Sequence, residues 1–203
     1  MGKSEVLAKA LAFGLTFLGY ASLHALREGW SYSKKQLEKG VGVSEEYLGI
    51  VDALYLVSYS LGMAALGSII HKFSLKNYIA IGLLVASCSY MLFPIIYQLT
   101  GFYSEALMTI LMCINGFSQA TGWPGMMGVF GNWFKKNKKG VIMAIWAMNA
   151  NVGNIIASSI CNVLQNEGLS WFWNFFVTGL FGIAVGVLIF FFLKDKPDEE
   201  EEE

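Results

Sequence analysis

Two ionisable residues near the end of the first apolar stretch have the chemistry to bind an anion. Arg27 follows an apolar run that ends at Leu26, and His24 lies about one helical turn earlier. A guanidinium is planar, always charged and able to donate two parallel hydrogen bonds, which suits a phosphate or a carboxylate. An ionisable group inside a membrane span indicates function. The alternative is that Arg27 ends the helix and extends to lipid headgroups, and position alone slightly favours it.

A second polar group begins in the next apolar run. Asp52, Tyr55 and Tyr59 follow one another at helical spacing and share one stripe. They could face a water-filled substrate path, or they could be an interfacial acid with tyrosines at the membrane boundary. The sequence favours neither interpretation over the other.

A third group contains amides and hydroxyls. Asn151, Asn154 and Ser158 share a helix face. Hydrogen bonding between helices is the favoured interpretation, and a contribution of Asn151 to a substrate site is the alternative.

No pattern of catalytic residues accompanies these groups. The sequence contains no GxxxxGK[ST], GxSxG or HExxH motif, and its two histidines and three cysteines lack metal-site spacing. We therefore expect no enzyme activity, no cofactor and no metal site. A formal net charge of −1 also argues against a nucleic-acid partner.

The composition predicts a membrane protein. Of the 203 residues, 55% are hydrophobic and only 14% are charged, too few charges to coat a soluble domain. The near-neutral charge depends on an acidic tail, Asp198 and residues 199–203, without which 14 basic and 9 acidic side chains remain.

Long apolar runs predict an all-α, polytopic fold with six transmembrane helices. A span needs about 20 mainly apolar residues. The six runs cover residues 6–26, 48–70, 78–97, 106–134, 141–164 and 169–193. We expect a 3+3 inverted repeat, with the bundle over residues 1–193 and an acidic tail or truncated central loop over residues 194–203. The widest loop is predicted at residues 31–47, with Ser44 as the N-cap of the second helix. The sequence Gly-Trp-Pro-Gly at residues 122–125 predicts a break or kink.

The lysines predict the orientation. With six spans, both chain ends lie on the same side of the membrane as the loop between spans two and three (the 2–3 loop) and the loop between spans four and five (the 4–5 loop). That side carries ten lysines: Lys3, Lys9, Lys72, Lys76, Lys135, Lys136, Lys138, Lys139, Lys194 and Lys196. The opposite side carries Lys34, Lys35 and Lys39, offset by acids. The positive-inside rule then puts both termini on the cytoplasmic-equivalent side of the membrane.

Several motifs resemble one family. They are LGIVDA at residues 48–53, YSLGM at 59–63, GFSQATGWPG at 116–125, GNWF at 131–134, GVIMAIW at 140–146 and VGNI at 152–155. Together they resemble the sugar-phosphate exchanger branch of the major facilitator superfamily, over nearly the whole chain but only over the N-terminal half of a twelve-helix member. The resemblance implies alternating-access exchange of phosphate esters for inorganic phosphate, with the anion held by Arg27. His24 lies where relatives often have a histidine and is the second candidate for substrate binding.

The chain also departs from the family pattern. Relatives commonly follow the arginine with lysine, where this chain has Glu28. The bacterial antiporters' helix-two lysine and helix-five histidine fall on Met63 and Ala150, and the 2–3 loop motif that normally has Asp-Arg reads His71-Lys72. One basic substrate contact is retained and several are absent.

Two functions follow. The first is half of a phosphate or sugar-phosphate antiporter, whose partner is a second transporter half or a second copy of the chain. The second is a non-transporting accessory subunit of a larger membrane complex. We expect an integral, multi-pass protein of the endoplasmic reticulum or another organelle, or of the mitochondrial inner membrane in the accessory case.

Overall fold

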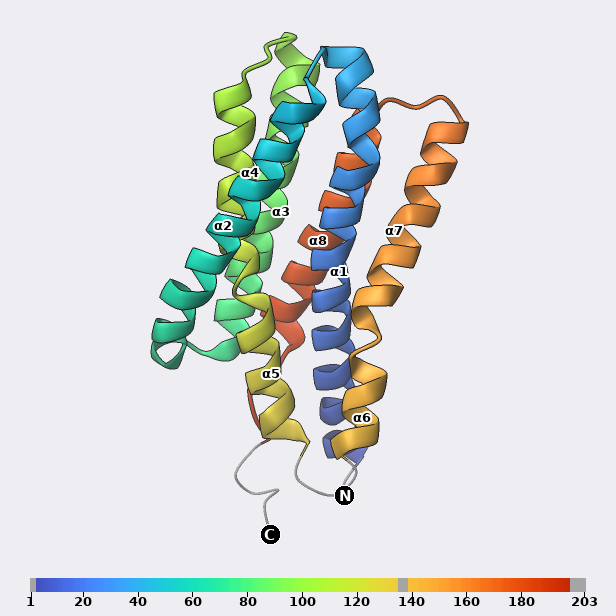
Figure 1. Ribbon diagram of the computed structural model, residues 1–203. Coiled ribbons are helices and arrows are strands. Elements are labelled where there is room, and N and C mark those ends of the chain that lie inside the picture. Colours follow the sequence, from blue (N-terminus) through green and yellow to red (C-terminus); the bar gives the residue numbers. More distant parts are fainter. Residues whose placement is uncertain (1–2, 135–138, 198–203) are drawn as a thin grey trace.

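A computed structural model describes residues 3–134 and 139–197. Within them the chain forms helices and no strands (Figure 1). The elements are α1 (Lys3–Val41), α2 (Glu45–Ile69), the 3-10 helix η1 (Ile70–Lys72), α3 (Leu75–Thr100), α4 (Glu105–Gln119), α5 (Gly122–Trp133), α6 (Lys139–Trp146), α7 (Asn149–Asn166) and α8 (Trp171–Phe192). Lys135, Lys136, Lys138 and the acidic tail from Asp198 onward lie outside the described residues.

The six predicted spans all appear as helical segments, and the fourth and fifth spans are each interrupted once. Among the described residues, five helical segments are long and apolar enough to cross a membrane. The fourth predicted span is divided into α4 and α5, which have 15 and 12 residues. The all-α six-helix membrane fold is therefore confirmed.

The break between α4 and α5 lies at the predicted Gly-Trp-Pro-Gly sequence. Pro124 has no N–H, so the carbonyl of Ala120 loses its ordinary helical donor. Just before the proline, the backbone amides of Ala120 and Thr121 donate to the carbonyls of Phe117 and Ser118, three residues earlier, as in a 3-10 turn. A second break, between α6 and α7, was not predicted. There the Asn149 side-chain amide donates to the carbonyl of Trp146 at 2.6 Å.

The predicted wide loop at residues 31–47 is wrong. Helix α1 continues for 39 residues to Val41, and only residues 42–44 separate it from α2. Lysine, glutamine, leucine and glutamate between residues 34 and 39 are good helix formers, and Leu37 is fully buried. A helix need not end where its apolar run ends. The N-cap prediction is confirmed, because Ser44 Oγ accepts a hydrogen bond from the amide of Tyr47.

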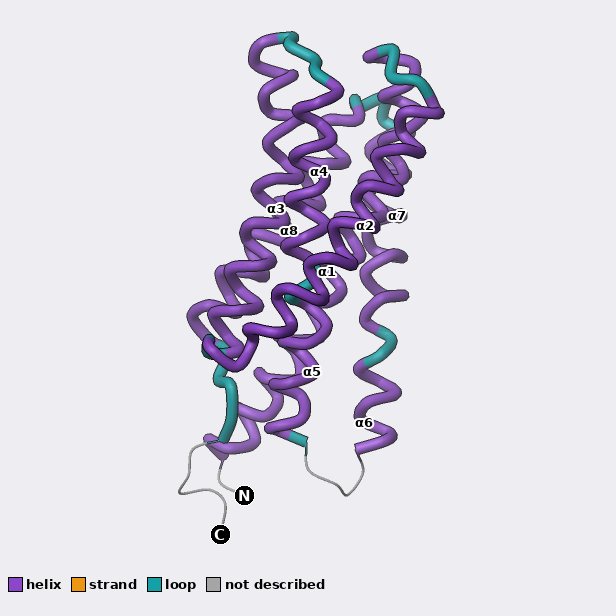
Figure 2. The backbone as a smooth tube through the Cα atoms, turned by 60° about the vertical axis from the view of Figure 1, so that its left-hand side comes forward, coloured by secondary structure: helices purple, strands orange, loops and turns teal. Residues whose placement is uncertain are grey.

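The packing pattern supports an internal repeat. Helix α8 packs against α1 and α3, α4 packs against α2 and α3, and α7 packs against α1. The six spans are, in order, α1, α2, α3, α4–α5, α6–α7 and α8. If span one is exchanged with span four, span two with span five and span three with span six, the same set of main contacts results, as a 3+3 repeat requires. Figure 2 shows α7 at the edge of the bundle.

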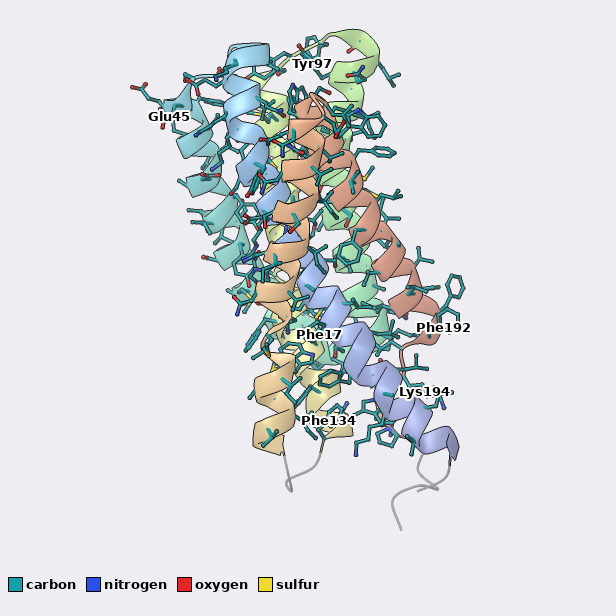
Figure 3. The ribbon with its side chains drawn as sticks, turned by 90° about the vertical axis from the view of Figure 1, so that its right-hand side faces the viewer. Phe17, Glu45, Tyr97, Phe134, Phe192 and Lys194 are labelled. Atoms are coloured by element: carbon teal, nitrogen blue, oxygen red, sulfur yellow. The ribbon has the colours of Figure 1, made fainter. Side chains whose placement is uncertain are left out.

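The two ends of the bundle carry different groups. Glu45 and Tyr97 lie at one end, whereas Phe134 and Lys194 lie at the other (Figure 3). Helix α1 begins and α8 ends at this second end (Figure 1). There the Asp195 carboxylate accepts hydrogen bonds from the amides of Leu75 and Lys76, at 2.8 and 2.6 Å. The segment after α8 thus caps the start of α3.

Candidate functional site

Arg27 lies well inside α1, because the helix continues for 14 residues beyond it to Val41. The side chain is half-buried, and its Nε donates to Gln119 Oε1 at 3.0 Å. This position does not fit the alternative in which Arg27 ends a helix and extends to the headgroups. The charge is instead directed toward α4, inside the bundle.

Gln119 is fixed by a chain of hydrogen bonds that begins in the core. Its Nε2 donates to Asn115 Oδ1 at 2.9 Å, and Asn115 Nδ2 donates to the carbonyl of Ala86 on α3 at 2.7 Å. Both Gln119 and Asn115 are 1% exposed. This network orients the Gln119 oxygen toward Arg27.

Two tyrosines from α2 complete the surroundings of the guanidinium. Tyr55 Oη donates to the same Gln119 Oε1 at 2.9 Å. The Arg27 guanidinium carbon lies 5.7 Å from the centre of the Tyr55 ring and 4.9 Å from that of the Tyr59 ring. Such cation–π contacts stabilise a cation without neutralising it. The structure thus brings Arg27, Tyr55 and Tyr59 together.

The surroundings of Arg27 leave its charge without a counter-ion in the described part of the chain. Among the described residues no carboxylate lies within ion-pair distance of it. Glu28, its neighbour in sequence, lies near Cys161 on α7. Arg27 lines a cavity of about 240 Å³ between α1, α2, α3 and α4, and Glu28 is not among the lining residues.

His24 and Asn151 lie apart from this cavity. His24 is half-buried, is within hydrogen-bonding reach of Asn154 on α7, and has its ring 5.2 Å from that of Tyr20. Asn151 is exposed. Neither residue is among those that line the Arg27 cavity.

Asp52 lies at the outer side of the same cavity, where outer means toward the end that carries Glu45. Its Oδ1 accepts a hydrogen bond from Trp30 Nε1 at 2.6 Å, and its Oδ2 pairs with Lys34 Nζ. A second cavity, of about 460 Å³, lies beyond this pair. Asp52 thus joins α2 to α1.

Sequence reasoning missed Gln119, Asn115, Trp30 and Lys34. Gln119 lies within the GFSQATGWPG motif, so the motif was noticed and its buried amide was not. Lys34 was counted only as a charge beyond the membrane, because the predicted loop at residues 31–47 hid its place on the helix face that carries Arg27. Seven residues separate the two cations, a spacing of two helical turns.

Comparison with known proteins gives a consistent result. Residues 10–203 match the Major Facilitator Superfamily. The putative glycerol-3-phosphate transporter 1 of Arabidopsis thaliana is 30% identical over 94% of this chain and 42% of its own length. Sugar phosphate exchanger 3 of Bos taurus is 29% identical over 93% of this chain and 43% of its own length. The glucose-6-phosphate exchanger SLC37A2 of Xenopus laevis is 32% identical over 91% of this chain and 41% of its own length. The chain spans about four tenths of the length of these relatives.

Proposed function

The chain belongs to the Major Facilitator Superfamily and is an integral, multi-pass membrane protein, and we propose that it forms the anion-binding half of a phosphate-ester:phosphate antiporter. Support comes from relatives named as transporters and exchangers of sugar phosphates and glycerol-3-phosphate. The accessory-subunit alternative gains no support from these relatives.

The charge of Arg27, which no carboxylate among residues 3–134 and 139–197 neutralises, carries the proposal. A half-buried guanidinium in a membrane bundle is costly unless an anion or a carboxylate accompanies it. Here Gln119 and two tyrosines orient the guanidinium but leave its charge free. Two oxygens of a tetrahedral phosphate group can accept parallel hydrogen bonds from two of the remaining N–H donors of the planar guanidinium.

The site occupies one side of a pathway, and transport needs a second wall. Arg27 is contributed by α1 and its surroundings by α2, α3 and α4, all within this chain. In the proposed mechanism a second half, either another polypeptide or a second copy, closes the opposite side, and the two halves rock around the bound anion. The Lys-rich end faces the cytoplasmic-equivalent side.

The test measures binding of inorganic phosphate to the purified full chain in lipid nanodiscs by isothermal titration calorimetry. Arg27→Ala should abolish binding, and Arg27→Lys should weaken it because the bidentate fork is lost. Lys72→Gln is the matched control, because it removes one positive charge at the end of the bundle that carries Lys194, away from the Arg27 cavity. Counterflow of labelled phosphate into liposomes that contain the chain, with and without proteins that co-purify with it, then tests exchange. Unchanged phosphate affinity in Arg27→Ala contradicts the proposal, and co-purification with a large complex without any phosphate binding favours the accessory role.

A further inference from the structure

A lysine–aspartate pair separates the Arg27 cavity from a larger cavity on its outer side. The inner cavity, of about 240 Å³, and the outer cavity, of about 460 Å³, share three lining residues: Ser31, Lys34 and Asp52. Arg27 lines only the inner cavity, and Lys35 and Glu45 line only the outer one. The ion pair of Lys34 and Asp52 therefore lies where the two cavities adjoin.

The pair is built so that it can open. The side chains of Lys34 and Asp52 are 28% and 40% exposed, and partly exposed pairs of this kind are weak because water competes for both charges. Asp52 also accepts a hydrogen bond from Trp30 Nε1 at 2.6 Å, so its carboxylate keeps a donor after Lys34 leaves. Lys34 lies 5.7 Å from the centre of the Trp30 ring, a contact that holds the ammonium near the passage.

The position of Lys34 matches that of Arg27. Both side chains line the inner cavity, and their seven-residue spacing in α1 corresponds to about 10 Å along the helix. An anion could move from one cation to the other along one face of α1.

Building on the proposed function, we propose that Lys34 is a second anion-binding group and that Asp52 is its displaceable counter-ion. An incoming phosphate or phosphate ester from the outer cavity replaces the carboxylate at Lys34 and then continues to Arg27. Until then Asp52 neutralises Lys34 and repels anions that bind too weakly to displace it. The pair thus acts as a charge-selective gate for phosphate-bearing anions, and Lys34 is released only when such an anion arrives.

Phosphate titration of the purified full chain in nanodiscs tests this gate. Asp52→Asn frees Lys34 and removes a negative charge from the passage, so phosphate affinity should rise about tenfold. Lys34→Gln should lower the affinity about tenfold, and Lys34→Arg should largely retain it. The double variant Lys34→Gln with Asp52→Asn should bind phosphate more tightly than Lys34→Gln, because it lacks the unpaired carboxylate, and more weakly than Asp52→Asn, because it lacks the Lys34 cation. Lys39→Gln, an exposed charge removed from the same end of α1, is the control and should bind phosphate as the unaltered chain does.

Two results would overturn the gate, and they are distinct from failure of the proposed function. If the pair serves only to hold α1 and α2 together, both Asp52→Asn and Lys34→Gln lower the unfolding temperature while phosphate affinity stays constant. If Asp52→Asn weakens phosphate binding, the carboxylate is not a competitor of the anion. In both cases Arg27→Ala still abolishes binding. If Arg27→Ala leaves binding unchanged, the proposed function itself fails and the gate fails with it.

Discussion

At the level of single residues, Gln119 explains how an arginine can be held in place and still carry its full charge. Its Oε1 accepts hydrogen bonds from both Arg27 Nε and Tyr55 Oη. A carboxylate at this point would orient the guanidinium equally well but would neutralise it. A neutral amide that is itself fixed by Asn115 orients the guanidinium without competing with an incoming anion.

This difference predicts the effect of Gln119→Glu. The substituted side chain has nearly the same shape, but it places a negative charge within hydrogen-bonding distance of Arg27. We expect phosphate affinity to fall by at least about tenfold, because the attraction between the added carboxylate and Arg27 in a half-buried site exceeds ~1.4 kcal/mol. Calorimetric titration with phosphate measures the change. Gln98→Glu adds the same charge at an exposed position and should bind as the unaltered chain does; equal losses in both variants would contradict a local effect.

The site could be predicted only in part, for identifiable reasons. Arg27, Tyr55 and Tyr59 were visible as ionisable or aromatic groups at helical spacing, and the structure places them side by side. Gln119 was not singled out, because an amide within an apolar run has no pattern that separates a site from ordinary helix packing. Lys34 was hidden by an incorrect helix end. The role of Asn151 stays a prediction.

At the level of the helices, close packing depends on where glycine meets a neighbouring backbone. A Cβ atom on Gly153 of α7 would overlap the carbonyl oxygen of Ala21 on α1, whereas a Cβ on Gly67 of α2 would meet no atom within 4 Å. The first glycine therefore sets the distance between two helices and the second does not.

Two alanine substitutions test this distinction. Gly153→Ala should destabilise the bundle by ~1–3 kcal/mol, because backbone atoms cannot move aside as a flexible side chain can. Gly67→Ala should be neutral or slightly stabilising, since alanine is the better helix former. Thermal unfolding in detergent compares the two variants. Equal unfolding temperatures would contradict the proposed role of Gly153 in the packing of α1 against α7.

The segment after α8 provides a second test at this scale. Asp195 accepts hydrogen bonds from the amides of Leu75 and Lys76 at the start of α3, where a negative charge also favours the helix dipole. Asp195→Ala should therefore lower the free energy of unfolding by ~1 kcal/mol, as the loss of an N-cap does. Chemical denaturation in mixed micelles measures it. Glu38→Ala, at an exposed position of α1, should cause no comparable loss, and a similar loss there would argue against capping.

The helices and most of their ends followed from the sequence, but the end of α1 and the break between α6 and α7 did not. Apolar runs located all six spans, because lipid requires about 20 apolar residues of any crossing helix. They could not show that α1 continues to Val41, since a polar helix is also stable where it packs on protein, as Leu37 does. Proline made the break before α5 predictable. At the break at residues 147–148 the side-chain amide of Asn149 donates to the carbonyl of Trp146, a contact that no local pattern predicts.

At the level of the whole molecule, the distribution of charge predicts the orientation. The end at which α1 begins and α8 ends (Figure 1) carries Lys9, Lys72, Lys76, Lys194 and Lys196 among the described residues. The end that carries Glu45 has Lys34, Lys35 and Lys39 together with acidic residues. Moving lysines near helix ends across a bilayer during insertion is disfavoured, so the lysine-rich end should remain on the cytoplasmic-equivalent side.

Single cysteines at the two ends test this orientation directly. Lys39→Cys and Lys72→Cys each place a thiol at an exposed position, and a membrane-impermeant maleimide labels only thiols that face its own compartment. In sealed vesicles with the non-cytoplasmic side outward, Lys39→Cys should react at once and Lys72→Cys only after the membrane is permeabilised. The parent chain, with its own three cysteines, gives the background. The reverse pattern would invert the orientation. The cavity that contains Lys34 would then open toward the cytoplasm, and phosphate would meet the Lys34–Asp52 pair from that side.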